Sequence, residues 1–243
     1  MKAMVLAAGL GTRLRPLTDD RPKALVEVAG RTLLDITLAR LRDFGIRDVI
    51  INLHHFADLV ATYLKNHGDF GMNIEVSRED VLLDTGGGLK KAAWFFAHDS
   101  EPFLLHNVDV ISTIDFAAML RVHKQREALA TLAVQDRQTS RYLLFDDQMR
   151  LCGRRSGDGA PEMARPCQWP QPLAFAGIHL ISPRIFSLMS EEGVFPIVPC
   201  YLRLAAQDES VVAFRADQFY WRDLGKPANV KQAAADIEAG LLG

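Results

Sequence analysis

Short apolar runs alternate with helical patterns along the first 107 residues. Residues 2–8 form an apolar run that ends at Gly9, which predicts a buried strand closed by a turn. Over residues 32–44 the apolar positions recur at helical spacing, and Gly45 follows at the place of a C-terminal cap. The same patterns predict strands over 48–53, 73–77 and 102–107 and helices over 56–66 and 88–96.

The second half of the chain is less regular. Its patterns predict helices over 115–127, 183–189 and 227–239, and strands over 130–135, 142–145, 173–181, 211–214 and 219–222. Residues 154–172 contain four prolines and two glycines, so we expect a surface excursion with weak structure there.

This order of elements predicts an α/β fold. Parallel strands need crossovers, and helices usually supply them, so we expect a mostly parallel sheet with helices on both faces. No linker or repeat divides the chain, which indicates a single domain over residues 1–243. Ligands of such sheets bind beyond the carboxyl ends of the strands, which points to the loops after Ala8, Ser77 and Asn107.

The composition of the chain argues against nucleic-acid-binding and membrane proteins. The 28 basic and 30 acidic residues are evenly mixed, so we expect no nucleic-acid partner. No apolar stretch reaches the ~20 residues that span a bilayer, and the start of the chain is too short for a signal peptide. We therefore expect no membrane partner and a cytoplasmic location. Three cysteines without a CxxC pair indicate reduced thiols.

A loop with the composition of a phosphate site follows the first strand. Gly9 and Gly11 let backbone amides approach an anion, and Arg13 and Arg15 add charge. The dinucleotide fingerprint fails because Leu14 stands where a glycine is needed, and no Walker loop occurs. A plain turn with solvated arginines is the alternative to a nucleotide loop.

Two motifs carry a resemblance to a known family. The run LAAGLGTRLRPLT over residues 6–18, followed by PKALV over 22–26, resembles the sugar-1-phosphate nucleotidyltransferases. Within that family the likeness is to N-acetylmuramate-1-phosphate uridylyltransferases and mannose-1-phosphate guanylyltransferase-like proteins. It implies a Rossmann-like, mixed and mostly parallel sheet flanked by helices, of the glycosyltransferase-A kind. Residues 1–110 would bind the nucleotide and residues 111–243 the sugar phosphate.

The resemblance also implies an activity and its catalytic residues. Such enzymes transfer a nucleoside monophosphate from a nucleoside triphosphate to a sugar-1-phosphate, releasing pyrophosphate and forming a nucleoside-diphosphate sugar. Arg13, Lys23 and Asp109 would be catalytic, with Mg²⁺ held by Asp109 and Asp223. Negative charge builds up on the phosphates during this reaction, and cationic groups stabilise it. The nucleotide-binding set would be Ala8, Gly9, Gly11, Thr12, Arg13, Lys23, Thr85, Gly86 and Gly87.

Other residues of these motifs carry weaker expectations. Three glycines over 86–88 precede a predicted helix and would contact the base, or else Asp84 or Thr85 merely caps that helix. The sugar pocket would contain Asn107, Phe175, Ala176 and Gly177. Arg155 and Glu162 are possible holders of the sugar or its phosphate, and Lys226 either touches phosphate or faces water. His54, His55 and His106 are better explained as structural than as metal ligands.

The substrate pair is the least determined feature. The opening motif, the short chain and the glycine run favour UTP with N-acetylmuramate-1-phosphate or a similar amino-sugar phosphate. GTP with mannose-1-phosphate stays an alternative, because Val108 and Lys226 depart from the usual patterns. A glycosyltransferase of the same fold and a non-catalytic sugar-nucleotide sensor are two rival functions. The sequence indicates no oligomeric state.

Overall fold

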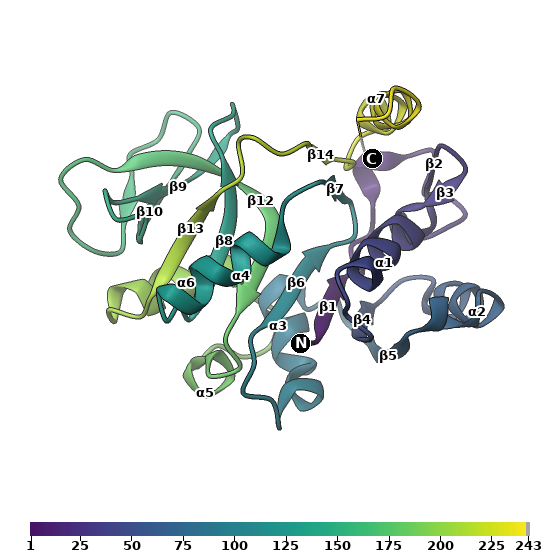
Figure 1. Ribbon diagram of the computed structural model, residues 1–243, viewed down its shortest axis with the longest axis horizontal. Helices are drawn as coiled ribbons and strands as arrows, with labels where there is room; N and C mark the ends of the chain where they lie inside the picture. Colours follow the sequence, from purple (N-terminus) through teal and green to yellow (C-terminus); the bar gives the residue numbers. More distant parts are fainter. Residues whose placement is uncertain (242–243) are drawn as a thin grey trace.

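A mixed sheet of ten strands forms the centre of the protein (Figure 1). The computed structural model describes residues 1–241. Across the sheet lie β11 (Glu162–Met163), β10 (Leu151–Ser156), β9 (Arg141–Phe145), β12 (Gln171–Ile181), β6 (Phe103–Asn107), β1 (Ala3–Leu6), β4 (Asp48–Leu53) and β5 (Asn73–Arg78). In addition, β8 (Ala130–Gln135) pairs with β12, and β13 (Val211–Arg215) pairs with β8.

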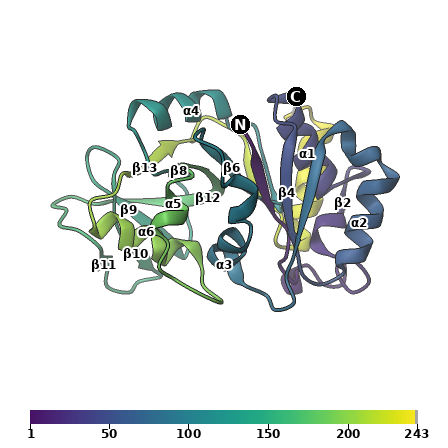
Figure 2. The same cartoon turned by 90° about the horizontal axis from the view of Figure 1, so that it is seen from below.

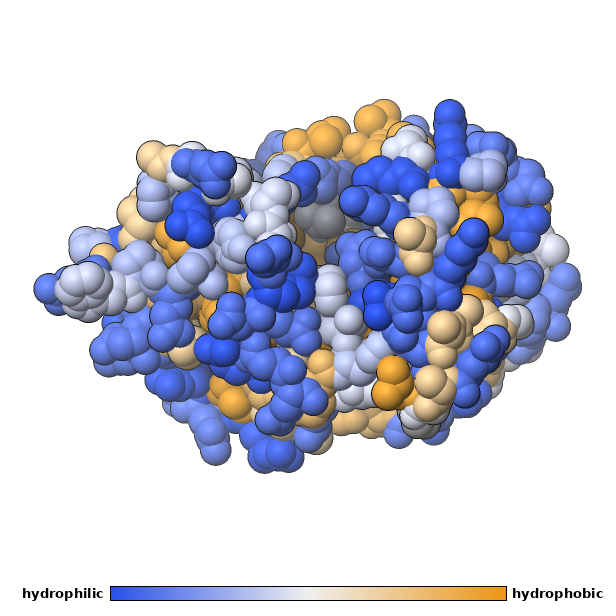
Figure 3. All heavy atoms as spheres, turned by 90° about the horizontal axis from the view of Figure 1, so that it is seen from above, coloured by the Kyte–Doolittle hydropathy of each residue, from blue (hydrophilic) through white to orange (hydrophobic). Residues whose placement is uncertain are grey.

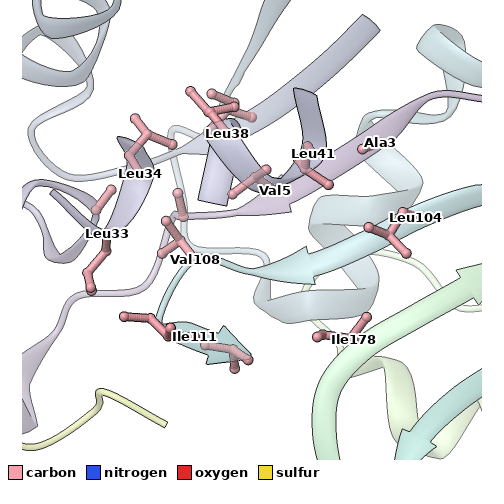
Figure 4. Packing of buried hydrophobic residues seen from close by; sticks show 14 of the residues in the cluster. Ala3, Val5, Leu33, Leu34, Leu38, Leu41, Leu104, Val108, Ile111 and Ile178 are labelled. Carbon is pink, nitrogen blue, oxygen red and sulfur yellow. The ribbon is translucent and has the colours of Figure 1, made fainter. Parts of the chain in front are cut away.

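The first half of the chain builds the parallel part of this sheet. β6, β1, β4 and β5 are all parallel, and the apolar side chains of β6, β1 and β4 are largely buried on both faces. Ala3 and Val5 pack against Leu34, Leu38 and Leu41 of α1 (Leu33–Asp43) (Figure 4). α2 (Ala57–Asn66) lies on that side too, whereas α3 (Asp84–Lys91) covers the opposite face (Figure 2). The predicted α/β fold with helices on both faces is confirmed.

The direction of the strands changes at β12. It runs antiparallel to β6, β8 and β9, and the antiparallel ladder continues through β10 to β11. α4 (Phe116–Gln125) covers one face of this part, and α5 (Ile185–Leu188) and α6 (Ile197–Ala206) cover the other. A small ladder joins β7 (Val110–Ser112) to β14 (Trp221–Asp223), and α7 (Pro227–Glu238) follows it.

Short elements complete the chain. β2 (Glu27–Val28) and β3 (Arg31–Thr32) form a hairpin, and 3₁₀ turns cover Thr12–Leu14, Lys23–Leu25, Gly68–Gly71 and Ala93–Phe96. Among residues 1–241, no helix has the length and apolar character that crossing a bilayer requires.

Three sequence expectations are wrong. The glycines 86–88 do not precede a helix but lie inside α3, which ends at Lys91 and gives way to the 3₁₀ turn. Residues 154–172 are not uniformly irregular, because β10 runs to Ser156, β11 pairs with it, and β12 begins at Gln171. The third error is that no helix was predicted over residues 197–206, where the structure has α6. Pro199 within this stretch normally indicates a helix break. Pro199 lies in the first turn of that helix, where its backbone nitrogen needs no partner.

Close packing explains why α3 contains glycines. A Cβ on Gly87 would lie 2.4 Å from the carbonyl oxygen of Gly193, and one on Gly86 would lie 2.4 Å from the Phe195 ring. Both amides donate to the Phe195 carbonyl oxygen, at 2.9 and 3.1 Å. The helix therefore accepts residues of poor helix propensity because the 193–195 loop lies directly against its backbone.

We expect Gly87→Ala to destabilise the protein by about 2 kcal/mol, although alanine normally favours a helix over glycine. The added methyl group meets a backbone oxygen that cannot rotate away. Urea unfolding measures the change. Gly9→Ala, whose Cβ would have no atom within 4 Å, serves as the control and should change the free energy of unfolding by less than about 1 kcal/mol. Equal effects of the two variants would contradict the packing explanation.

Buried histidines should make the fold sensitive to mild acid. Burial lowers the pKa of His106 and of His179 to about 3, and that of His123 to about 4. Since each folded pKa lies below the unfolded value near 6.5, protonation favours the unfolded chain. The stability that these neutral side chains confer is complete above about pH 6.5 and is lost as the pH falls toward their folded pKa values.

The free energy of unfolding should therefore fall between pH 7 and pH 5, by up to about 2 kcal/mol for each buried histidine. Urea titrations at the two pH values measure this difference. His179→Gln should reduce the pH dependence, whereas His98→Gln, at an exposed position, should leave it unchanged. A wild-type stability that is the same at both pH values would show that these histidines do not titrate in this way.

Candidate active site

A large cavity opens at the carboxyl ends of the central strands. It has a volume of about 1210 Å³ and lies between the β8, β9 and β10 strands and the β14 segment. Figure 3 looks onto the molecule from above the view of Figure 1, and this face is mostly hydrophilic. The cavity is lined by seven residues of the expected catalytic, metal, nucleotide and sugar sets: Arg13, Thr85, Asn107, Phe175, Ala176, Gly177 and Asp223. The further candidates Arg155 and Lys226 also line it, whereas Glu162 does not.

The two expected metal ligands lie on neighbouring segments. Asp109 stands between β6 and β7, and β14 pairs with β7 so that Asp223 is opposite Val110. The amide of Leu224 also donates to the carbonyl oxygen of Asp109, at 2.8 Å. Pairing of β7 with β14 thus brings together two carboxylates that are 114 residues apart in the sequence.

Lys23 forms an ion pair with Asp109. Their side chains are only 14% and 11% exposed, so the pair is largely shielded from water. Pro22, in an extended conformation, leads into the 3₁₀ turn that begins at Lys23. Charges in such a site interact more strongly than charges on the surface, because little water screens them.

Glycines let the loop after β1 approach this pair. Gly11 has a φ of 64°, which favours glycine, and a Cβ there would lie 3.0 Å from Thr18 and 3.3 Å from the Cβ of Lys23. At Gly225 a Cβ would lie 2.7 Å from the Asp223 carboxylate and 2.8 Å from the Arg13 guanidinium. The side chains of Arg13 and Asp223 therefore both lie close to Gly225, and the first loop of the chain reaches its last strand.

Gly177 shapes the other side of the site. Its φ is 74°, and a Cβ would lie 2.8 Å from the Asn107 side-chain nitrogen and 3.0 Å from Val110. This position marks the irregularity in the pairing of β12 with β8 between Phe175 and His179. The glycine allows Asn107 to approach β12, so the two expected sugar residues lie side by side.

The remaining residues of the expected catalytic, nucleotide and sugar sets do not line the cavity. Lys23 and Asp109 lie beside it as the ion pair already described, and Ala8 is buried. Gly86 and Gly87 face the 193–195 loop, while Thr85 at the start of α3 does line the cavity. The Thr85 hydroxyl oxygen accepts a hydrogen bond from the Ile197 amide, at 2.9 Å. Gly9, Gly11 and Thr12 also lie outside the lining.

A buried polar network supports the first loop, and the sequence patterns missed it. The Asn52 side chain accepts from the Ala7 amide at 2.8 Å and donates to Glu79 at 2.7 Å. Glu79 accepts in turn from the Leu83 amide, just before α3. Asn52 and Glu79 are 3% and 4% exposed, so their polar groups depend on these bonds. The network fixes the ends of β1, β4 and β5 relative to α3.

No group of three or more histidine, cysteine or acidic side chains that could hold a metal occurs in residues 1–241. Mg²⁺ does not need such a cage, because it binds through one or two carboxylates together with substrate phosphates and water. Asp109 and Asp223 offer two carboxylates at the edge of a cavity that is large enough for substrate phosphates. The oxygen donors present therefore fit this ion.

A family model described as "Nucleotidyl transferase" matches residues 2–145. The chain belongs to the nucleotidyl transferase family. It is 36% identical to the N-acetylmuramate alpha-1-phosphate uridylyltransferase of Caulobacter vibrioides, over 98% of this chain and 96% of that protein. It is 31% identical to the mannose-1-phosphate guanyltransferase of Yarrowia lipolytica, over 93% of this chain but only 61% of that longer protein.

Solved structures share the fold of this nucleotidyltransferase. HddC from Yersinia pseudotuberculosis, crystallised with GMP-PN, superposes with a TM-score of 0.78 at 19% identity, over 97% of this chain and 99% of that one. A UDP-glucose pyrophosphorylase bound to UDP-glucose gives the same TM-score at 16% identity, over 98% of both chains. At these identities the likeness concerns the fold, and it confirms the expected Rossmann-like architecture.

Proposed function

We propose that this nucleotidyltransferase uses UTP and N-acetylmuramate-1-phosphate, or a similar amino-sugar phosphate. The Caulobacter relative, whose name states this activity, matches along nearly the whole of both chains. The guanyltransferases match along similar stretches of this chain but extend well beyond it. The single observation that carries the proposal is that Arg13 and Asp223 line one cavity and that the ion pair of Lys23 with Asp109 lies beside it.

The proposed reaction follows from where the charges lie. An oxygen of the sugar phosphate attacks the α-phosphorus of UTP, the bond from that phosphorus to the bridging oxygen breaks, and pyrophosphate leaves. Negative charge grows on the phosphates during this step. Arg13 and the Lys23 ammonium would stabilise this charge in a site that is partly shielded from water. Lys23 would then contact a phosphate oxygen and pair less closely with Asp109.

Mg²⁺ is the proposed cofactor, with Asp109 and Asp223 as its protein ligands. When bound, the ion would neutralise phosphate charge and align the reacting groups. The amide of Gly225 donates to the Asp223 carboxylate at 2.7 Å, which holds that side chain in place. Buried Asp109 is held by Lys23 in the same way.

The proposal assigns the halves of the chain to the two substrates. Residues 1–110 would hold the nucleotide, with Thr85 at the base, and residues 111–243 would hold the sugar around Phe175 and Gly177. Gly86 and Gly87 would position Thr85 by packing α3 on the 193–195 loop. A cytoplasmic location is part of the proposal, because nucleoside triphosphates are found there.

A screen of four nucleoside triphosphates against sugar-1-phosphates tests the substrate pair. We expect the highest kcat/KM for UTP with N-acetylmuramate-1-phosphate. The contrary result is a kcat/KM for GTP with mannose-1-phosphate that exceeds the value for UTP with N-acetylmuramate-1-phosphate by more than about tenfold. Such a ratio corresponds to ~1.4 kcal/mol of transition-state free energy in favour of GTP. That result would assign the enzyme to the guanylyltransferase side of the family.

A further inference from the structure

The cavity carries more positive charge than one sugar phosphate requires. Seven basic side chains and two carboxylates line it. Within residues 1–241, only two of the seven, Arg154 and Arg222, have carboxylate partners, which are Glu162 and Asp236. Unpaired cations that converge on a cavity favour anionic ligands. Three of the unpaired cations lie on one part of the sheet: Arg137 on the loop between β8 and β9, Arg141 on β9 and Arg155 on β10 (Figure 1).

Arg137, just beyond β8, is held rigidly beside the metal-binding carboxylates. Its guanidinium lies 3.9 Å from the Trp221 ring centroid and donates to the Phe175 carbonyl oxygen at 2.9 Å. Trp221 donates in turn to the Ala176 carbonyl oxygen at 2.7 Å, and it lies two residues before Asp223. The buried Nε of Arg137 has no hydrogen-bond partner. Arg137 is thus placed to hold the phosphate that enters next to Asp223.

Arg155 is a second cation with a separate anchor. In the register of the sheet it lies opposite Tyr142, Tyr142 lies opposite Ala174, and Ala174 lies opposite Gln135. Opposed residues share a face of the sheet, so Arg155 is on the cavity face together with Tyr142. Its guanidinium lies 5.2 Å from the Tyr142 ring centroid, and its buried Nε is also without a partner.

The two guanidinium groups belong to different parts of the sheet. Arg137 reaches the carbonyl oxygen of Phe175 on β12, whereas Arg155 lies on β10, next to β9. Each guanidinium packs against its own aromatic ring, Trp221 of β14 for one and Tyr142 of β9 for the other. Two separate anchors suit two anionic groups on one ligand better than a single phosphate shared by both arginines.

We propose that Arg137 binds the phosphate of the sugar-1-phosphate and that Arg155 binds a carboxylate carried elsewhere on the same sugar. This inference rests on the proposed function and makes it more specific, because it restricts the sugar to an acidic one. Arginine suits the role, since its planar fork of donors matches a carboxylate.

Calorimetric titration with two sugar phosphates tests the assignment without requiring turnover. N-acetylmuramate-1-phosphate and N-acetylglucosamine-1-phosphate differ by a lactyl ether that bears a carboxylate. We expect the wild type to bind the carboxylated sugar at least about tenfold more tightly. Arg155→Gln should reduce this preference to less than about threefold, and Arg137→Gln should weaken both sugars by about tenfold or more while keeping the preference.

Arg184→Gln is the control, because Arg184 lies outside the cavity lining and is paired with Glu209. It should change neither affinity by more than about threefold. Each variant should melt within about 2 °C of the wild type, and Arg155→Met replaces Arg155→Gln if that one does not fold. Equal binding of the two sugars by the wild type, or an equal loss of both in Arg155→Gln, would overturn the proposal.

A separate assay of pyrophosphate release distinguishes failure of this inference from failure of the proposed function. Turnover of both sugars without a binding preference leaves the function standing and removes the role of Arg155. The expected binding pattern without pyrophosphate release from UTP supports the two-anion site and removes the proposed reaction.

Discussion

Asp109→Asn should lower kcat by at least about a hundredfold while the protein stays folded. The substitution keeps the shape of the side chain but removes one of the two carboxylates that meet where β14 pairs with β7. It also deprives Lys23 of its ion-pair partner. Release of pyrophosphate at saturating Mg²⁺, UTP and sugar phosphate measures the effect.

Asp223→Asn should have an effect of the same order, because its carboxylate is the second proposed ligand. Asp208→Asn is the control, since Asp208 is exposed and makes no ion pair within residues 1–241. A rate close to that of the wild type in either site variant would remove that aspartate from the metal site.

Lys23→Ala should cost about 3 kcal/mol of transition-state stabilisation, roughly a hundredfold in kcat. The ammonium is 14% exposed, so its charge acts with little screening by water. Pre-steady-state measurement of the chemical step separates this loss from any change in substrate affinity.

The surface lysine Lys124 provides a matched comparison, because it too is ion-paired, with Glu101 at 3.0 Å, but both side chains are more than half exposed. Lys124→Ala should leave kcat unchanged. If Lys23→Ala raised KM and left the chemical step intact, Lys23 would be a binding residue and not a catalytic one.

The sequence was sufficient for features that depend on local pattern. The strand over Asp48–Leu53 has the predicted bounds, since its apolar residues, three of them consecutive over 49–51, form a short buried run. The two-part motif that includes Lys23 led to the family because its residues are fixed in type and spacing, and the family is confirmed. The roles of Arg13, Lys23, Asp109 and Asp223 stay predictions.

Features that depend on distant contacts could not be predicted in this way. Glycines normally indicate a loop, so the run over 86–88 concealed the start of α3. The glycines are needed there because the 193–195 loop lies directly against the helix. Arg137 looks like an ordinary surface arginine in the sequence, and Arg155 is there only a candidate holder of the sugar or its phosphate. Only the register across β8, β12, β9 and β10 places Arg155 on the cavity face.

The transfer of a nucleoside monophosphate is tested most directly by ³¹P NMR of a mixture of enzyme, Mg²⁺, UTP and N-acetylmuramate-1-phosphate. We expect the signals of UTP and of the sugar phosphate to decline together, with one equivalent of pyrophosphate and one of a nucleoside-diphosphate sugar appearing. Omitting the sugar phosphate should stop the reaction. An enzyme that forms no pyrophosphate with any sugar-1-phosphate, but releases UDP from a ready-made UDP-sugar, would contradict the proposed function.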